Sequence, residues 1–168
     1  MSTQRVSLKE ALQVAFNGAS SEDFVGQLRA NFPELDLLWG DGTSDDQANR
    51  FWCDASRSVL TGADDDLDLR ALANGPGGAT VLLAEVRALY LVASRSNTTT
   101  LTVTKGASNG WTAPGASWTM DLKPGASIRL VDGKDGQYPT SGSDKVLRVT
   151  NGSGATATYA ILAIGVSA

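Results

Sequence analysis

The sequence predicts a mainly β protein: an antiparallel β-sandwich or jelly-roll-like domain with a short N-terminal helical segment. Short runs of alternating apolar and polar residues fill roughly the last hundred positions. Turns rich in Gly, Pro, Asn and Asp separate these runs at the intervals typical of two packed sheets. A chain of 168 residues with 18 Gly is long enough for one buried core. We therefore expect an N-terminal helical arm or adaptor over residues 1–38 and a β-sandwich domain over residues 39–168.

Residues 7–31 have the periodicity of two short helices. The segment from Ser7 to Glu10 fits a capping box, Asn17 and Gly18 end the first helix, and Pro33 closes the second. The apolar positions at helical spacing include Leu8, Leu12, Phe16, Phe24 and Leu28. Helices this short are not stable alone, so something must cover their apolar stripes. Packing against the β domain and docking onto a neighbouring subunit both remain open.

Eight later segments have strand patterning. In residues 50–60 the alternation puts Phe51, Cys53 and Ala55 on one apolar face. Residues 80–93 are the most hydrophobic, and their β-branched and aromatic content favours a long central strand over a helix. Residues 155–166 end wholly apolar, which predicts a central strand buried on both faces. The eight ranges are 50–60, 64–69 (an edge strand), 80–93, 98–105, 117–122, 126–131, 145–150 and 155–166.

Composition argues against several classes of function. The chain has no His and a single Cys, so no imidazole base exists to activate a nucleophile, and Cys53 is expected to be a small buried apolar residue. The net charge is −4 without a basic run, which argues against a nucleic-acid partner. The polar first nine residues and the short apolar stretches indicate neither a signal peptide nor a membrane span. We expect a soluble protein made in the cytoplasm.

Two carboxylate clusters are candidate metal sites. One contains Asp41, Asp45 and Asp46, and the other extends from Asp64 to Asp68. Calcium favours such oxygen-rich loops, but the ligand spacing of a helix-loop-helix calcium site is missing, and solvated turns explain both clusters. No zinc pattern and no phosphate-binding loop is present. The sequence therefore predicts no enzyme, no cofactor and no metal site.

A series of short motifs covers three-quarters of the chain in a characteristic order. They are Trp39-Gly40-Asp41-Gly42-Thr43, Gln47-Ala48-Asn49-Arg50, Asp65-Asp66-Leu67-Asp68-Leu69, Val86-Arg87-Ala88-Leu89-Tyr90-Leu91, Leu101-Thr102-Val103, Lys123-Pro124-Gly125-Ala126, Val146-Leu147-Arg148-Val149-Thr150-Asn151 and the ending from Ala157 to Gly165. In this order and spacing, residues from about 39 to 166 resemble a family of small β-rich virion structural proteins of tailed bacteriophages. Residues 1–38 lie outside the resemblance.

The resemblance implies a capsid decoration or head-associated protein located in the virion. Such proteins are commonly oligomeric β-sandwiches, often trimers around local symmetry axes, so a homo-oligomer with a trimer favoured is expected. The partners it implies are the major capsid protein or other virion proteins. It carries over no catalytic residues.

Two functions remain open at this stage. The leading one is a decoration or cement protein that clamps an assembled capsid through a buried apolar patch with a polar rim. The hypothetical partner contacts are the apolar residues of the N-terminal helices together with three tryptophans expected to be exposed: Trp39, Trp52 and Trp111. The alternative is a receptor- or glycan-binding module of a tail or head fibre, in which Trp residues and acidic loops form a shallow sugar site.

Overall fold

The computed structural model of the chain describes residues 6–7, 38–39, 42–75, 78–132, 136–152 and 154–167. Within these ranges the chain is mainly β and contains no α-helix. The strands are β1 (Val6–Ser7), β2 (Leu38–Trp39), β3 (Arg50–Val59), β4 (Ala63–Asp68), β5 (Glu85–Ala93), β6 (Leu101–Lys105), β7 (Thr119–Leu122), β8 (Ser127–Val131), β9 (Val146–Asn151) and β10 (Ala157–Val166).

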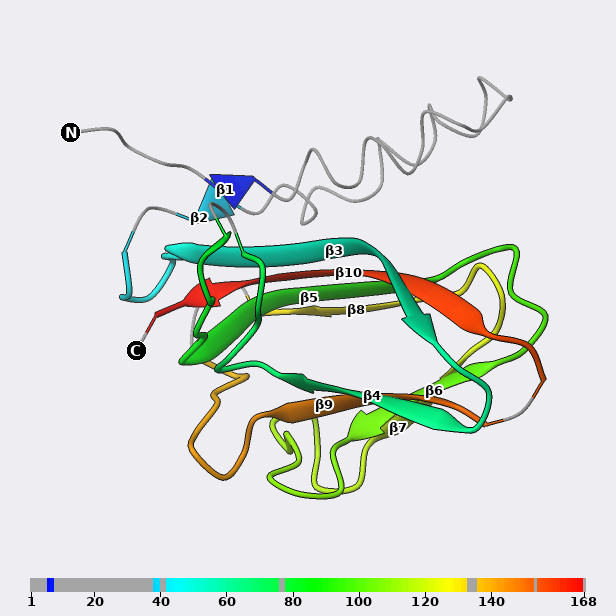
Figure 1. The fold of residues 1–168 in the computed structure, drawn as a ribbon. Coiled ribbons are helices and arrows are strands. Elements are labelled where there is room, and N and C mark those ends of the chain that lie inside the picture. The colour runs from blue at the N-terminus through cyan, green and yellow to red at the C-terminus, as the bar shows by residue number, and fades with distance from the viewer. Residues whose placement is uncertain are drawn as a thin grey trace, which may run out of the picture.

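The eight longer strands form two four-stranded antiparallel sheets. The first sheet has the order β3-β10-β5-β8 and the second has the order β4-β9-β6-β7. Figure 1 shows the two sheets stacked face to face, with β3 bending at its end and leading directly into β4 in the other sheet. The short β1-β2 pair lies beyond the first sheet, on the side away from the second. The predictions of a mainly β chain and of two antiparallel sheets are confirmed.

The two sheets share one apolar core. Inward-facing residues of the second sheet, such as Leu101, Val103 and Leu147, belong to the same buried cluster as Leu89 and Leu91 of the first sheet. This follows from strand geometry, because alternate side chains of each strand point to the same side. The alternation predicted for residues 98–105 and 145–150 is therefore confirmed, and β10 is central in its sheet, as expected from its apolar ending.

The strand predicted over residues 80–93 is shorter than expected. Strand β5 begins only at Glu85. Before it, Leu72 and Val81 exchange two backbone hydrogen bonds of 3.0 and 2.8 Å, and the amide of Leu83 donates to the carbonyl of Leu69. Val81 and Leu83 therefore hydrogen-bond to the segment that follows β4, and residues 80–84 are not part of β5. This stretch is apolar because Val81 and Leu83 are buried in the core.

The face predicted for β3 is wrong. Phe51, Cys53 and Ala55 point outward and are exposed, while Trp52 enters the core. The indole nitrogen of Trp52 donates to the carbonyl of Ala73 at 2.8 Å. Trp52 and Val59 are the buried residues of β3, so the ring of Trp52 lies on the side of the strand that points inward.

The predicted helical segment falls almost entirely outside the described residues. Its first position, Ser7, lies in β1, where it pairs with Leu38. The predicted contact residues Leu8, Leu12, Phe16, Phe24 and Leu28 lie outside the described residues.

Candidate partner-binding face

The outward side of the first sheet carries three cross-strand rows of mostly uncharged side chains. The rows are Phe51-Ile164-Ala88-Val131, then Cys53-Leu162-Tyr90-Arg129, then Ala55-Ala160-Val92-Ser127. A register shift of β3 between Tyr159 and Ile161 leaves two β3 residues opposite Ala160, which is a β-bulge. We call the second and third rows, together with Arg95 at the end of β5, the open face.

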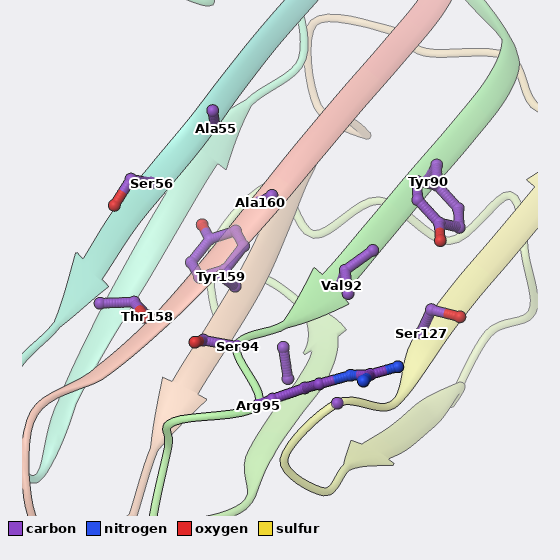
Figure 2. A pocket seen from close by; sticks show the side chains of 12 residues that line it. Ala55, Ser56, Tyr90, Val92, Ser94, Arg95, Ser127, Thr158, Tyr159 and Ala160 are labelled. Atoms are coloured by element: carbon purple, nitrogen blue, oxygen red, sulfur yellow. The ribbon is translucent and has the colours of Figure 1, made fainter. Parts of the chain in front are cut away.

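A hollow of about 370 Å³ lies on the open face. Small side chains such as Ala55, Ala160 and Ser127 form its floor beside Val92, and Figure 2 shows Tyr90 at one end of them. At the other end, Arg95 reaches from beyond β5 toward β8. The hollow exists because residues with one or two side-chain heavy atoms lie between these two long side chains. Its volume is at the lower end of ligand sites, which span roughly 300–1,000 Å³.

The turn before β8 holds Arg95 in place. Gly125 has a positive φ of 80°, which favours glycine. A Cβ added there would approach Cγ of Arg95 to 3.1 Å. The aliphatic stem of Arg95 thus packs over a bare backbone, and its guanidinium stays at the rim of the hollow.

The only charges on the open face are positive. They belong to Arg95 and to Arg129, the cross-strand neighbour of Tyr90. Within the part of the chain that the structure describes, neither guanidinium pairs with a carboxylate, and no Asp or Glu belongs to the open face. In a chain with a net charge of −4 this is a local excess of positive charge.

The two central residues of the first row are already covered by the chain itself, while Phe51 at the end of that row is 42% exposed. Trp39 of β2 and Ala48 pack against Ala88 and Ile164 in a second buried cluster. The outward side of the sheet is therefore divided: Trp39 and Ala48 bury Ala88 and Ile164 at one end, and the open face continues from there without a cover within the described residues.

Arg87 ties that cover to the sheet. Its Nε donates to the carbonyl of Gln47 at 3.2 Å, Nη2 donates to the carbonyl of Ser44 at 3.3 Å, and Nη1 donates to Oδ2 of Asp132 at 3.2 Å. It also forms an ion pair with Glu85. Burial raises the pKa of Glu85 above its usual value; Arg87 opposes this rise and the nearby Asp132 adds to it. Arg87 is therefore a structural anchor.

The outward side of the second sheet, which we call the polar face, is different in character. Nε and Nη2 of Arg148 donate to the two carboxylate oxygens of Asp66, each at 2.7 Å, and Nη1 lies 2.8 Å from Asp64. The hydroxyl of Thr150 donates to Asp64 at 2.6 Å, and Lys145 pairs with Asp68 at 2.7 Å. These carboxylates have protein partners. Within the described ranges, no three His, Cys, Asp or Glu side chains gather closely enough to hold a metal ion.

A third polar cluster joins the two sheets at the β3–β4 corner. Arg57 donates to both carboxylate oxygens of Asp65 at 2.8 Å, and the hydroxyl of Tyr159 donates to Oδ2 of Asp65 at 2.7 Å. Burial by itself raises the pKa of Asp65, but the hydrogen bonds from Arg57 and Tyr159 outweigh it and leave that pKa below its usual value. Burial, followed by the bond to Asp65, raises the pKa of Tyr159. The cluster is satisfied internally, so it holds the corner together.

The three tryptophans expected to be exposed are buried, and that expectation is wrong. Trp39, Trp52 and Trp111 are 1%, 3% and 0% exposed. Trp111 donates from its indole to the carbonyl of Pro139 at 2.9 Å and packs against Trp118 and Tyr138. Each ring is large, so burying it stabilises the fold more than leaving it exposed on the surface would. None of the three belongs to the open face.

Sequence patterning missed the residues that form the open face. Cys53 is exposed, contrary to expectation, and Tyr90 and Val92 lie half-buried in the segment 80–93, which the sequence predicts only as a long central strand. One signal is present in the sequence: within residues 126–131 the alternation separates Arg129 from Ile128 and Leu130, and Arg129 is exposed in the structure. The side chains that β5 and β10 contribute to the same side could not be found without the register.

No protein family, no curated protein and no solved structure matches this chain. In the part of the chain that the structure describes, no helix has the length and apolar character needed to cross a bilayer. The arrangement of the open face is suited to binding, because it combines accessible apolar side chains, a hollow and two arginines that have no carboxylate partner among the described residues.

Proposed function

We propose that the chain is a structural protein of a tailed-phage particle, a capsid decoration or head-associated protein that binds the assembled particle and stabilises it without catalysis. The observation that carries the proposal is the open face, because it combines a hollow lined mainly by small side chains with a positive rim on an otherwise acidic protein. The phage context comes from the sequence resemblance over residues of about 39 to 166. The partners proposed are the major capsid protein or other virion proteins, and the state proposed is a homo-oligomer, with a trimer favoured.

The strand order supports this proposal. The orders β3-β10-β5-β8 and β4-β9-β6-β7, with all pairings antiparallel, match the arrangement of a jelly roll. Jelly rolls recur in viral capsid domains and in lectins. The fold therefore accommodates both functions considered above, and the side chains of the surface must decide between them.

Partner binding by the open face would act as a clamp. A decoration protein stabilises a lattice by burying surface against it, and apolar surface contributes about 25 cal/mol for each Å² removed from water. The open face supplies apolar side chains from β3, β10 and β5, and β8 adds Arg129 and Ser127. A rigid sheet loses little conformational freedom on binding, which keeps the entropic cost of association low.

A receptor- or glycan-binding module is the second candidate. The lining of the hollow supports sugar binding in one respect, because Tyr90 offers an aromatic ring and Ser127 and Arg95 offer hydrogen-bonding groups. The residues first expected to bind the sugar do not support it: Trp39, Trp52 and Trp111 are buried, and the carboxylates of Asp64, Asp66 and Asp68 are paired with Arg or Lys.

The location of the chain on particles tests the proposal. Purified, salt-washed particles are analysed by quantitative mass spectrometry and by electron microscopy with gold-labelled antibodies against the chain. We expect many copies per particle, distributed over the head. Labelling confined to the tail tip or to fibres supports the second candidate, and absence of the chain from washed particles contradicts both.

A further inference from the structure

We propose that the open face binds an acidic peptide segment of a particle protein, with an apolar side chain of that segment in the hollow and its carboxylates on Arg95 and Arg129. This inference rests on the proposed function, since it names the part of the partner that the face recognises.

Charge is the first argument. Arg95 and Arg129 are exposed and have no carboxylate partner within the described residues, whereas Arg148, Lys145 and Arg57 are paired. Lys105 and Lys123 are also exposed and without a carboxylate partner within those residues, but neither belongs to the open face. An incoming carboxylate would thus meet a free guanidinium, which binds carboxylates through two parallel hydrogen bonds. No Asp or Glu of the open face competes for either arginine. A basic segment would instead meet two like charges.

The continuity of the face is the second argument. The neighbouring row of the same sheet side already buries an apolar segment, because Trp39 and Ala48 pack on Ala88 and Ile164. Leu162, one row further along, contacts that cluster and also belongs to the open face. The chain itself therefore shows that this sheet side accepts apolar polypeptide. The open face extends the same surface by two rows.

The lining of the hollow favours a peptide over a sugar. Sugar hydroxyls both donate and accept hydrogen bonds, and carboxylates and amides are the side chains that pair with them most completely. No Asp, Glu, Asn or Gln lines the hollow, and most of its side chains are Ala, Val and Ser. One Leu- or Phe-sized side chain is suited to the part of the floor formed by Ala55, Ala160 and Val92. Flanking carboxylates reach Arg95 at one end and Arg129, the cross-strand neighbour of Tyr90, at the other.

The test uses the full chain and two defined sets of probes. One set is an array of overlapping 15-residue peptides that covers the structural proteins of the particle. The other is an array of glycans that includes sialylated and uronic-acid sugars. Binding of the wild-type chain is compared with that of the double variant Arg95→Glu/Arg129→Glu. The matched charge control is Lys105→Glu, which changes an exposed residue of β6 in the other sheet.

A second pair of variants tests the hollow. Ser127→Trp places a large ring on exposed edge strand β8 at the hollow, and Thr119→Trp places the same ring on exposed edge strand β7 of the polar face. Urea unfolding and circular dichroism verify that each variant is folded. A folded Ser127→Trp variant occupies the hollow without introducing charge, so it separates shape from electrostatics.

We expect the wild-type chain to bind peptides that contain Asp or Glu around a Leu or Phe. Arg95→Glu/Arg129→Glu and Ser127→Trp each weaken binding at least tenfold, Lys105→Glu and Thr119→Trp leave it within twofold, and affinity falls between 50 and 500 mM NaCl. Selection of neutral or basic peptides, or binding that ignores the open-face variants, overturns the inference. So does arginine-dependent binding to anionic glycans alone. If no peptide binds while antibodies still find the chain on heads, the inference fails and the proposed function stands.

Discussion

The outward faces of the two sheets differ in whether their charged side chains are paired with opposite charges. On the polar face of the second sheet, Asp64, Asp66 and Asp68 are held by Arg148, Lys145 and a threonine hydroxyl. On the first sheet, the rows of the open face are uncharged except for arginines that have no carboxylate partner within the described residues. A face whose charges are already paired gains little from a partner. A face with unpaired cations and half-buried apolar groups gains more.

The strongest test of this contrast is Arg87→Ala, which removes the side chain that anchors the covered end of the first sheet. The change removes the guanidinium that pairs with the buried carboxylate of Asp132, and it removes the hydrogen bonds to the carbonyls of Ser44 and Gln47. We expect the free energy of unfolding to fall by about 3–5 kcal/mol. Urea denaturation followed by tryptophan fluorescence measures it. The exposed control Arg129→Ala is expected to stay within about 0.5 kcal/mol of wild type, and equal losses in the two variants would contradict the anchoring role of Arg87.

A smaller effect is expected at the corner between the faces, in Tyr159→Phe. The variant removes the hydroxyl that donates to Asp65 while keeping the ring in the core. The expected loss is about 1–2 kcal/mol near neutral pH. Chemical denaturation measures it, and an unchanged free energy of unfolding would show that the bond to Asp65 contributes nothing.

The same corner makes stability depend on pH in a defined direction. Asp65 has a lowered pKa in the folded chain, so its contribution is present above the unfolded value of about 3.9 and is lost as the pH falls through the folded pKa. Tyr159 has a raised pKa, so its contribution is present below about pH 10 and is lost as the pH rises above that value. Unfolding experiments at several pH values should give an alkaline decline that is shallower in Tyr159→Phe. An equally steep decline in both proteins would assign the effect to other groups.

Arg148→Ala on the polar face should have less effect than either change. Its carboxylate partners are 40% and 46% exposed, so water replaces much of the lost interaction. We expect a loss of at most about 1 kcal/mol that shrinks further in 0.5 M NaCl. Denaturation at low and high salt measures it. A loss as large as that in Arg87→Ala would remove the contrast between the two faces.

The least perturbing test is chemical labelling of Cys53. The thiol is exposed on the open face, so it should react with a thiol reagent in the native chain at a rate close to that in the urea-unfolded chain. Reaction should slow when an acidic peptide occupies the face. The number of thiols labelled over time gives both rates, and a native thiol that reacts only after unfolding would place Cys53 inside the protein.

Much of the fold was predictable, because strand period and turn chemistry are local properties. The alternation of Leu147 and Val149 and the wholly apolar end of β10 identified buried strands from neighbouring residues alone. The face of β3 was not predictable, because Phe51, Cys53 and Trp52 are all apolar and the alternation does not say which side is the core. The candidate site was missed for a related reason: its residues come from four strands that only the register brings together.

The sequence by itself determined that the chain forms short antiparallel strands around an apolar core, because alternation and glycine-rich turns are patterns of neighbouring residues. It also determined that no imidazole chemistry is available, because there is no His. Only the tertiary structure decided which carboxylates are paired, which tryptophans are buried and which arginines are left at the rim of a hollow. Those properties depend on contacts such as Arg148 with Asp66, which lie 82 positions apart in the chain, and no local pattern encodes such contacts.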